Sequence, residues 1–486
     1  MSGPRVAIIG GGNAALCAAI SAREQGAETH VFERAPFELR GGNSRFTAGA
    51  IRTTYDGVEQ LRELMPDLSD SEFANADFGS YSDTDFFADL GRLTQYRTDP
   101  DLAELLVNQS FPTLQWLRKH GVRFLPLYGR QSFNVYGKQR FWGGLTVEAW
   151  GGGAGLIDQL TSIAERLGVQ IHYASRATGL QRADDELLVN INNETTSAFD
   201  AVVLACGGFE SSAEMRARYL GPNWDLAKVR GTQFNTGDGI RMAQTLGAGT
   251  TGHWSGCHAV AWDLNAPEFG DLAVGDGFQK HSYPFGIMIN ANGERFLDEG
   301  ADFRNYTYAK YGREILQQPN HFAWQVFDAK VTHLLRDEYR IREVTKVAAD
   351  SIEALGEQMT GVDAQQFSKT VQAFNAAVQT SIPFDPTVKD GRRTSGLAIA
   401  KTNWANPLDT GPFEAYGVTC GVTFTFGGLR VNDTAAVLDE NGDLIRGLFA
   451  AGELVGGLYY HNYPGGSGLM AGAVFGRVAG RGAASQ

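Results

Sequence analysis

The sequence predicts an α/β fold in which a Rossmann-like domain is interrupted by an inserted second domain. Three observations support this prediction. Residues 5–33 have the strand, glycine loop, helix and strand order of a dinucleotide-binding unit. From about His253 that pattern gives way to aromatic residues and loops, and it returns from Gly427. The last seventy or so residues therefore complete the domain that the first residues begin.

The first unit has the spacing of the G-x-G-x-x-G/A fingerprint. An apolar run at 6–9 suits a buried strand, three glycines follow at 10–12, and an alanine stands three residues later. Glycines let the backbone approach a pyrophosphate, and the N-terminus of the helix predicted over 14–25 favours its charge. The strand at 29–33 ends in Glu33, which suits a ribose hydroxyl and disfavours the 2′-phosphate of NADP. The contacts expected in this unit are Gly10, Gly12, Asn13, Ala14, Ala15, Glu33 and Arg34.

The remaining elements follow from local patterns. Residues 57–125 are mainly helical in pattern, and another helix is predicted over 156–167. Strands at 169–173, 187–191 and 201–205 are assigned to the same α/β unit, and a helix to 240–246. Loops dominate 253–303, and helical segments fill 306–380. A strand at 448–451 and a helix from about 468 end the chain, so the predicted domains are 1–252 with 417–486, and 253–416 between them.

Composition narrows the class of protein. The 486 residues are 43% hydrophobic and carry a formal charge of −13, which argues against nucleic acid and anionic membranes as partners. An anionic substrate therefore needs a local cluster of arginines. The four cysteines form no C-x-x-C pattern, so no metal site is expected. No signal peptide precedes the first strand and no long apolar run suggests a membrane span, so we expect a cytoplasmic protein.

Several motifs spread along the chain resemble those of one flavoprotein family. That family contains fumarate reductase, 3-ketosteroid dehydrogenase and tricarballylate dehydrogenase, and the chain resembles tricarballylate dehydrogenase most, through residues 255–258, 299–308 and 461–466. The motifs occur in the family's order over nearly the whole chain. Besides the first fingerprint they are residues 41–44 (GGNS), 236–239 (TGDG), 292–296 (NGERF) and 447–453 (GLFAAGE).

The resemblance implies an FAD-binding domain of the glutathione-reductase type with an inserted α+β capping domain. Glu33 would bind the adenosine ribose, Ser44 would lie near the pyrophosphate or flavin, and Glu453 would reach the ribitol. No histidine follows the second glycine loop, so FAD is expected to be non-covalent. The last helix would place its N-terminus near the flavin carbonyl, where it stabilises negative charge. Further contacts expected are Gly42, Asn43, Ala177, Gly207, Gly208, Asp238, Gly452, Gly466, Ser467, Gly468 and Leu469.

Two residues are candidates for the chemistry of the substrate. Arg304 stands nine residues after Arg295, about where the fumarate reductases carry a proton-transfer arginine. The alternative for Arg304 is an ion pair with an acidic residue among 298–302. Tyr463 precedes Pro-Gly-Gly, as does the ketosteroid dehydrogenase tyrosine that polarises a ketone, and its alternative is a flavin-packing role. The fumarate reductases have an arginine there, so this difference disfavours fumarate itself.

Two histidines are further candidates. His258 stands where the fumarate reductases bind a substrate carboxylate, although a structural role is the alternative. His461 lies close to the turn expected near the flavin. A second substrate histidine of the fumarate reductases is replaced here by Thr423 and Phe424.

These features predict an FAD-dependent dehydrogenase, acting on CH–CH groups, that introduces an α,β double bond into a small carboxylate or cyclic keto acid. The alternatives are a ketone Δ1-dehydrogenase of the 3-ketosteroid type, an enoate reductase of the fumarate reductase type, and a non-catalytic flavoprotein. The expected partners are a small anionic or ketone-bearing substrate and an electron acceptor. That acceptor stays open among a quinone, an electron-transfer protein and oxygen.

Overall fold

The computed structural model describes residues 3–486. Its central sheet has six strands in the order β20-β21-β13-β1-β2-β9, parallel except at β20. The strand β21 comes from the C-terminal part of the chain and pairs with β13, so distant segments complete one sheet. The bounds are β1 (Arg5–Ile9), β2 (Glu28–Phe32), β9 (Gln170–His172), β13 (Ala201–Leu204), β20 (Ala436–Leu438) and β21 (Leu444–Ala450).

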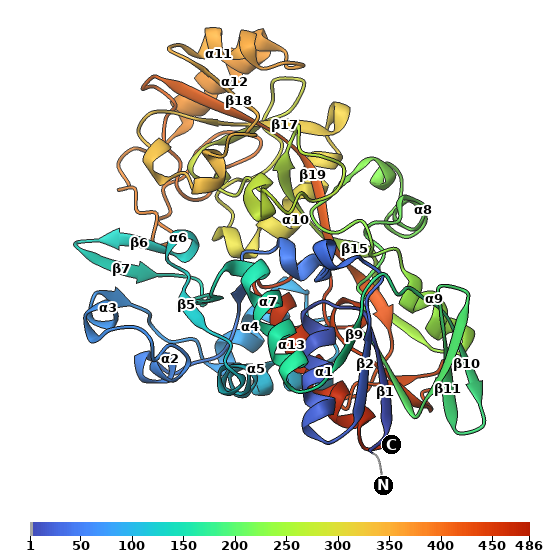
Figure 1. Cartoon of the computed structure of the whole chain (residues 1–486). Helices are drawn as coiled ribbons and strands as arrows, with labels where there is room; N and C mark the ends of the chain where they lie inside the picture. The colour runs from blue at the N-terminus through green and yellow to red at the C-terminus, as the bar shows by residue number, and fades with distance from the viewer. Residues whose placement is uncertain (1–2) are drawn as a thin grey trace.

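Two helices from opposite ends of the chain pack against each other beside this sheet (Figure 1). They are α1 (Asn13–Glu24) and α13 (Ser467–Ala483). Glycines of α13 allow the close approach, because a Cβ on Gly476 would lie 2.4 Å from the Ala14 carbonyl oxygen. A Cβ on Gly480 would lie 2.1 Å from the Ala18 oxygen. The packing therefore fixes the starts of both helices relative to each other.

The predicted strand at 187–191 exists, but not in the parallel sheet. It forms β11 (Glu186–Ile191), the middle strand of a separate antiparallel sheet with β10 (Ala177–Ala183) and β12 (Thr195–Phe199). Its burial alternates along the strand, as expected where one face of a hairpin meets water. The helix predicted at 240–246 is α9 (Asp238–Thr245).

A second large sheet is formed around β19, mainly by strands of residues 250–429. The prediction of loops and helices for 253–380 missed this sheet. Its strands β15 and β17 are buried along most of their length, so they lack the alternation that identifies a strand. The long β19 pairs with β14, β15, β17 and β18. The bounds are β14 (Lys228–Val229), β15 (Thr250–Asp263), β16 (Ile287–Ile289), β17 (Phe322–Phe327), β18 (Lys346–Ala349) and β19 (Phe413–Leu429).

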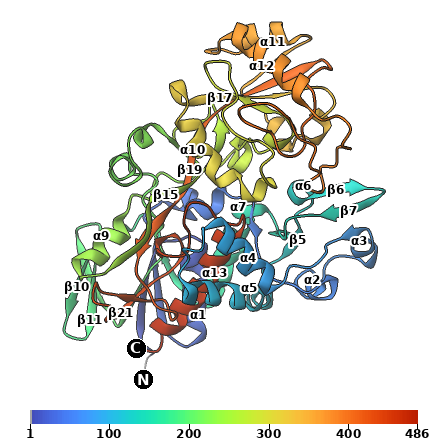
Figure 2. The same cartoon turned by 180° about the vertical axis from the view of Figure 1, so that it is seen from behind.

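Figure 2 shows α11 and α12 at the end of this second sheet that is farthest from the chain termini. The three helices of this part are α10 (Tyr308–Leu316), α11 (Ile352–Gln358) and α12 (Ala364–Ala377). The predicted domain boundaries at 252/253 and 416/417 lie within the strands β15 and β19. The domain boundaries themselves stay predictions.

The segment predicted as mainly helical, 57–125, contains four helices and two short strands. Two small sheets, β3-β8-β5 and β4-β7-β6, connect it to the rest. Among residues 3–486 we find no helix with the length and apolar character needed to cross a membrane. The elements here are β3 (Ala50–Ile51), α2 (Val58–Leu64), α3 (Asp70–Ala74), β4 (Ala76–Asp77), α4 (Asp83–Leu93), α5 (Pro100–His120), β5 (Phe124–Pro126), α6 (Tyr128–Gln131), β6 (Ser132–Val135), β7 (Lys138–Phe141), β8 (Val147–Ala149) and α7 (Gly152–Arg166).

Candidate active site

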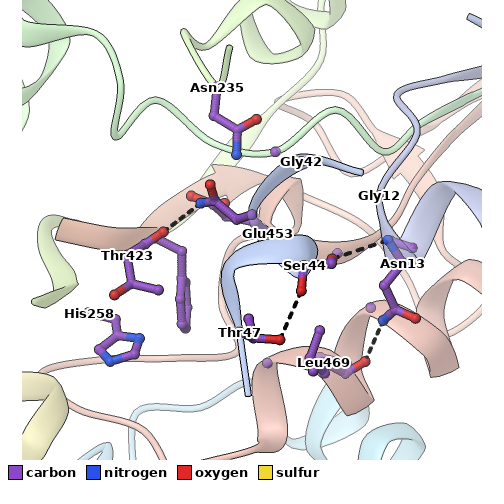
Figure 3. A pocket seen from close by; sticks show the side chains of 18 of the residues that line it. Gly12, Asn13, Gly42, Ser44, Thr47, Asn235, His258, Thr423, Glu453 and Leu469 are labelled. Atoms are coloured by element: carbon purple, nitrogen blue, oxygen red, sulfur yellow. Dashed lines mark hydrogen bonds between the residues drawn. The ribbon is translucent and has the colours of Figure 1, made fainter. Parts of the chain in front are cut away.

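A deep cavity is lined by the glycine loops of the first domain and by residues of β15 and β19 (Figure 3). Its empty space, including the open mouth, is about 1840 Å³. Its lining runs from Glu33 and Asp238 to Arg304 and Tyr463. The cavity therefore connects the predicted cofactor residues with the candidate substrate residues.

The structure brings most of the predicted cofactor residues to this cavity. Ala15, Gly208 and Ser467 do not line it. Ala15 is buried within α1, Gly208 packs against Glu453, and the Ser467 hydroxyl donates to the Pro464 carbonyl at 2.6 Å. Those that line it are Gly10, Gly12, Asn13, Ala14, Glu33, Arg34, Gly42, Asn43, Ser44, Ala177, Gly207, Asp238, Gly452, Glu453, Gly466, Gly468 and Leu469.

The first glycine loop has the shape that a dinucleotide requires. Gly10 has φ +115°, a conformation that glycine adopts without strain. A Cβ on Gly11 would lie 2.6 Å from Glu33 Oε2, so a side chain there would displace the carboxylate. Glu33 Oε1 accepts from the Ala35 N–H at 2.7 Å, and burial raises the pKa of Glu33. These residues fit FAD, since a buried carboxylate at the end of β2 suits a ribose hydroxyl.

The start of α13, beside that of α1, supports the same fit. The helix begins at Ser467 after Gly466, whose φ is +83°. Its first turn faces the cavity, where the helix dipole favours negative charge. The Asn13 side chain donates to the Leu469 carbonyl at 2.7 Å, which connects the first turns of α1 and α13 (Figure 3).

Asp238 reaches the cavity with its carboxylate already bound by three arginines. Arg34, Arg176 and Arg241 approach it at 3.1, 2.8 and 2.6 Å. Burial would raise the pKa of Asp238, but the hydrogen bond from Arg176 and the arginine charges lower it. Asp238 therefore fixes the positions of Arg34 and Arg176 at the cavity.

Arg304 lies in a short 3₁₀ helix, Arg304–Tyr306, and borders the cavity. Its Nη2 donates to the Arg130 carbonyl at 2.7 Å and to Gln131 Oε1 at 2.9 Å, while its Nε is buried without a partner. The alternative ion pair is not formed within residues 3–486, because Asp302 pairs with Arg92 and Glu299 with Arg295. Burial and the charge of Arg130 lower the pKa of Arg304.

Tyr463 and His258 meet in the same part of the cavity, together with Tyr308. The hydroxyl of Tyr463 is hydrogen-bonded to that of Tyr308. The His258 ring lies 4.8 Å from the Tyr463 ring and 4.9 Å from the Tyr308 ring. Both ring nitrogens of His258 are buried without partners, and burial with the charge of Arg230 holds its pKa well below the ordinary value. His258 is therefore neutral and offers hydrogen-bonding atoms to a ligand.

His461 does not line the cavity. Its backbone N–H donates to His253 Nδ1 at 3.0 Å, and its own ring packs against that of His253. No group of His, Cys, Asp and Glu side chains placed to hold a metal occurs among residues 3–486.

Sequence reasoning missed a charged group in the cavity. Arg230 and Arg130 both bind Asp276, at 2.7 and 2.8 Å, and all three side chains line the cavity. Tyr308 was also missed as an individual residue. No motif identifies these residues, because each comes from a different segment and stands alone in the sequence.

The comparisons with known proteins agree with this geometry. The sequence matches the FAD binding domain family over residues 5–469. It is 29% identical over 496 residues to a probable fumarate reductase from Shewanella frigidimarina, covering 99% of this chain and 74% of that protein. It is 26% identical over 566 residues to a 3-oxosteroid 1-dehydrogenase from Mycolicibacterium smegmatis, covering 98% of this chain and 96% of that protein. The open conformation of a flavocytochrome c3 fumarate reductase is similar in structure, with a TM-score of 0.72, 27% identity, and coverage of 99% of this chain and 78% of that chain.

The predicted α/β fold with its Rossmann-like FAD-binding domain is thereby confirmed, and so is the resemblance to fumarate reductases and ketosteroid dehydrogenases. The cofactor is FAD. The chain belongs to the FAD binding domain family and is an FAD-dependent oxidoreductase.

Proposed function

We propose that this enzyme is a dehydrogenase that introduces a C=C bond next to the carbonyl of a small carboxylate or keto acid, as tricarballylate dehydrogenase does. The observation that carries the proposal is the guanidinium of Arg304, which is buried at the cavity without an acidic partner. FAD supplies the hydride acceptor in such a reaction. The protein must then bind the carbonyl, orient the substrate and accept the proton from the carbon beside it.

Local charge supports an anionic substrate. Among residues 3–486, Arg130 and Arg230 form ion pairs with one carboxylate, that of Asp276, and Arg304 forms none, while the charge of Glu338, outside the cavity lining, acts on Arg130 and Arg304. The cavity therefore holds more positive than negative charge in this region, although the whole chain carries −13. Excess positive charge in a water-poor cleft attracts a carboxylate and stabilises an enolate.

The proposed roles follow from the chemistry of each group. Arg304 serves proton transfer, and its lowered pKa brings it closer to that task than an ordinary arginine. The Tyr463 hydroxyl donates to a substrate oxygen, with Tyr308 beside it as hydrogen-bond partner. His258, neutral and without a protein partner on either nitrogen, binds a second substrate oxygen. The electron acceptor is proposed to be a quinone, an electron-transfer protein or oxygen.

Anaerobic bleaching of the FAD absorbance tests the proposal. Saturated tricarballylate, a cyclic keto acid and a 3-ketosteroid are added in turn to the oxidised enzyme. We expect bleaching by tricarballylate or the keto acid, with the unsaturated product identified by mass spectrometry. Bleaching by none of the carboxylates would contradict the proposal.

A ketone dehydrogenase of the 3-ketosteroid type is the second candidate. The hydrogen-bonded pair of Tyr308 and Tyr463 favours it, because it offers an uncharged hydroxyl donor to a ketone oxygen. The similarity to 3-oxosteroid 1-dehydrogenase over 96% of that protein also supports it. Bleaching by the steroid alone would replace the first proposal with this one. A dye-coupled assay run in both directions distinguishes either from a reductase of the fumarate type.

A further inference from the structure

Two buried carboxyl groups meet at the cofactor cavity, and only one of them faces it. Glu453 follows β21 in a 3₁₀ helix, Gly452–Leu454, and lines the cavity. Glu210 follows β13 and the Gly207–Gly208 loop, is fully buried, and does not line the cavity. The two side chains are within hydrogen-bonding reach of each other. Glu210 belongs to none of the sequence motifs described above.

The hydrogen bonds around the pair are unequal. Glu453 Oε1 accepts from the Thr425 N–H at 2.8 Å and from its hydroxyl at 3.1 Å. Glu210 Oε1 accepts from the side-chain amides of Asn43 and Asn235, both at 2.6 Å. Glu210 Oε2 is buried and has no donor. In Figure 3 Asn235 and Glu453 lie on the same side of the cavity.

Among residues 3–486 no cation forms an ion pair with either carboxyl group, and the nearby Arg216 does not bond to their carboxylate oxygens. Arg216 donates to the backbone carbonyl of Glu210 at 2.5 Å, and its remaining bonds go to the carbonyls of residues 224, 225 and 227. The Cys257 thiol, which also faces both carboxyls, is kept neutral because burial raises its pKa. Two carboxylates in contact without a cation cannot both be charged. The pair therefore shares one proton.

The proton belongs on Glu210. Burial raises the pKa of Glu210 well above its ordinary value, and the charge and hydrogen bond of Glu453 raise it further. The pKa of Glu453 is also raised by burial, but the hydrogen bonds with Glu210 and Thr425 oppose that rise. The one oxygen of Glu210 that faces no donor is thus available to carry the proton.

We propose that Glu210 is a positioning residue for FAD: it donates a hydrogen bond to Glu453 and so holds the Glu453 carboxylate as an acceptor for a cofactor hydroxyl. Loss of the Glu210 proton leaves two adjacent charges, which push Glu453 away from that position. FAD affinity therefore falls as pH rises through the pKa of Glu210. The proposal concerns the cofactor alone and does not depend on which substrate is oxidised.

Fluorescence titration of the apoprotein with FAD, from about pH 6 to about pH 9, tests the proposal. In the wild-type protein we expect the Kd to rise with pH. Glu210→Gln keeps a donor for Glu453 and an acceptor for the asparagines but cannot ionise, so its Kd should stay near the low-pH wild-type value throughout. Glu210→Ala loses the donor and should bind FAD at least about tenfold more weakly at every pH.

Glu148→Gln is the matched control, because burial raises the pKa of Glu148 to about 7 and this residue does not line the cavity. It should keep the wild-type pH dependence. A Glu210→Gln protein that retains the wild-type dependence, or a wild-type Kd that does not change with pH, would overturn the proposal. Should Glu210→Ala fail to fold, calorimetry on the wild type in two buffers still counts the protons exchanged on binding. A count that does not change between low and high pH would also overturn it.

Discussion

The guanidinium of Arg304 is buried with two hydrogen bonds and no carboxylate, an arrangement that costs free energy unless a ligand compensates it. Arg92 and Arg295 differ in this respect, since they pair with Asp302 and Glu299, whereas the buried Arg336 forms no ion pair within residues 3–486 either. An unpaired buried cation beside a cavity is typical of a functional position, because stability alone would favour its replacement.

Arg304→Gln should remove the proposed proton-transfer group while keeping hydrogen-bonding capacity. We expect kcat to fall by about 10²- to 10⁴-fold, the range for loss of a general acid–base group. The ratio of FAD to protein should not change. Steady-state kinetics and the flavin absorbance of the purified protein measure both. Arg393→Ala, at an exposed arginine that bonds Gln379 Oε1 at 3.3 Å, is the control. Near-normal turnover of Arg304→Gln with FAD bound would refute the assigned role.

The hydroxyls of Tyr463 and Tyr308 can be tested separately, because phenylalanine removes each one at nearly constant volume. Tyr463→Phe should lower kcat/KM by about 10- to 100-fold, since a donor to the reacting carbonyl oxygen is lost. Tyr308→Phe should have a smaller effect, because Tyr308 acts through Tyr463. Tyr311→Phe, which removes a hydroxyl bonded to the Asp298 carbonyl, is the control. A larger loss in Tyr308→Phe than in Tyr463→Phe would reverse the assignment.

At the scale of elements, the chain's first and last helices illustrate what a sequence can predict. The glycines at 10–12, Glu33 and the helix start near 468 were predictable, because each belongs to a short contiguous pattern with a known physical role. The strands β15 and β17 were not, because strands buried on both faces lack alternation. The meeting of Arg130, Arg230 and Tyr308 was also not predictable, since it depends on how separate elements pack.

The contact between α1 and α13 depends on glycines that a helix would otherwise disfavour. Alanine for glycine in a helix interior normally stabilises a protein by about 1 kcal/mol. At Gly480 the added Cβ would lie 2.1 Å from the Ala18 carbonyl oxygen, so α13 must move away from α1. We therefore expect Gly480→Ala to lower the free energy of unfolding by about 1–3 kcal/mol, as overpacking does. Urea unfolding measures this change.

Gly129→Ala is the control for this substitution, because a Cβ at Gly129 meets nothing within 4 Å. It should change the free energy of unfolding little. Because α1 and α13 both begin at the cofactor cavity, Gly480→Ala should also weaken FAD binding. An unchanged or raised stability of Gly480→Ala would mean that the two helices can separate without cost.

At the scale of the whole molecule, buried titratable groups inside the protein make stability depend on pH with opposite signs. His258 and His281 are fully buried with both ring nitrogens unpartnered, and burial holds the pKa of each well below its ordinary value. Glu210 has a raised pKa, chiefly from burial. Below about pH 6.5 the unfolded chain protonates these histidines and the folded chain does not, so they lower stability as pH falls. Above about pH 4.5 and below its raised pKa, Glu210 is protonated in the folded chain but not in the unfolded chain. Its contribution to stability therefore grows as pH falls through this range.

Replacing one group of each kind separates these contributions. His281→Phe should unfold with a weaker pH dependence below about pH 6.5, because one histidine contributes up to about 1.4 kcal/mol per pH unit there. Its stability relative to wild type therefore falls as pH rises from about 5 to 6.5 and is constant above about 7. Glu210→Gln should show the reverse trend, gaining stability relative to wild type as pH rises above about 4.5. Urea unfolding of the apoproteins over this range measures both slopes. If the two variants shift the slope in the same direction, at least one of these groups does not have the protonation state that its burial dictates.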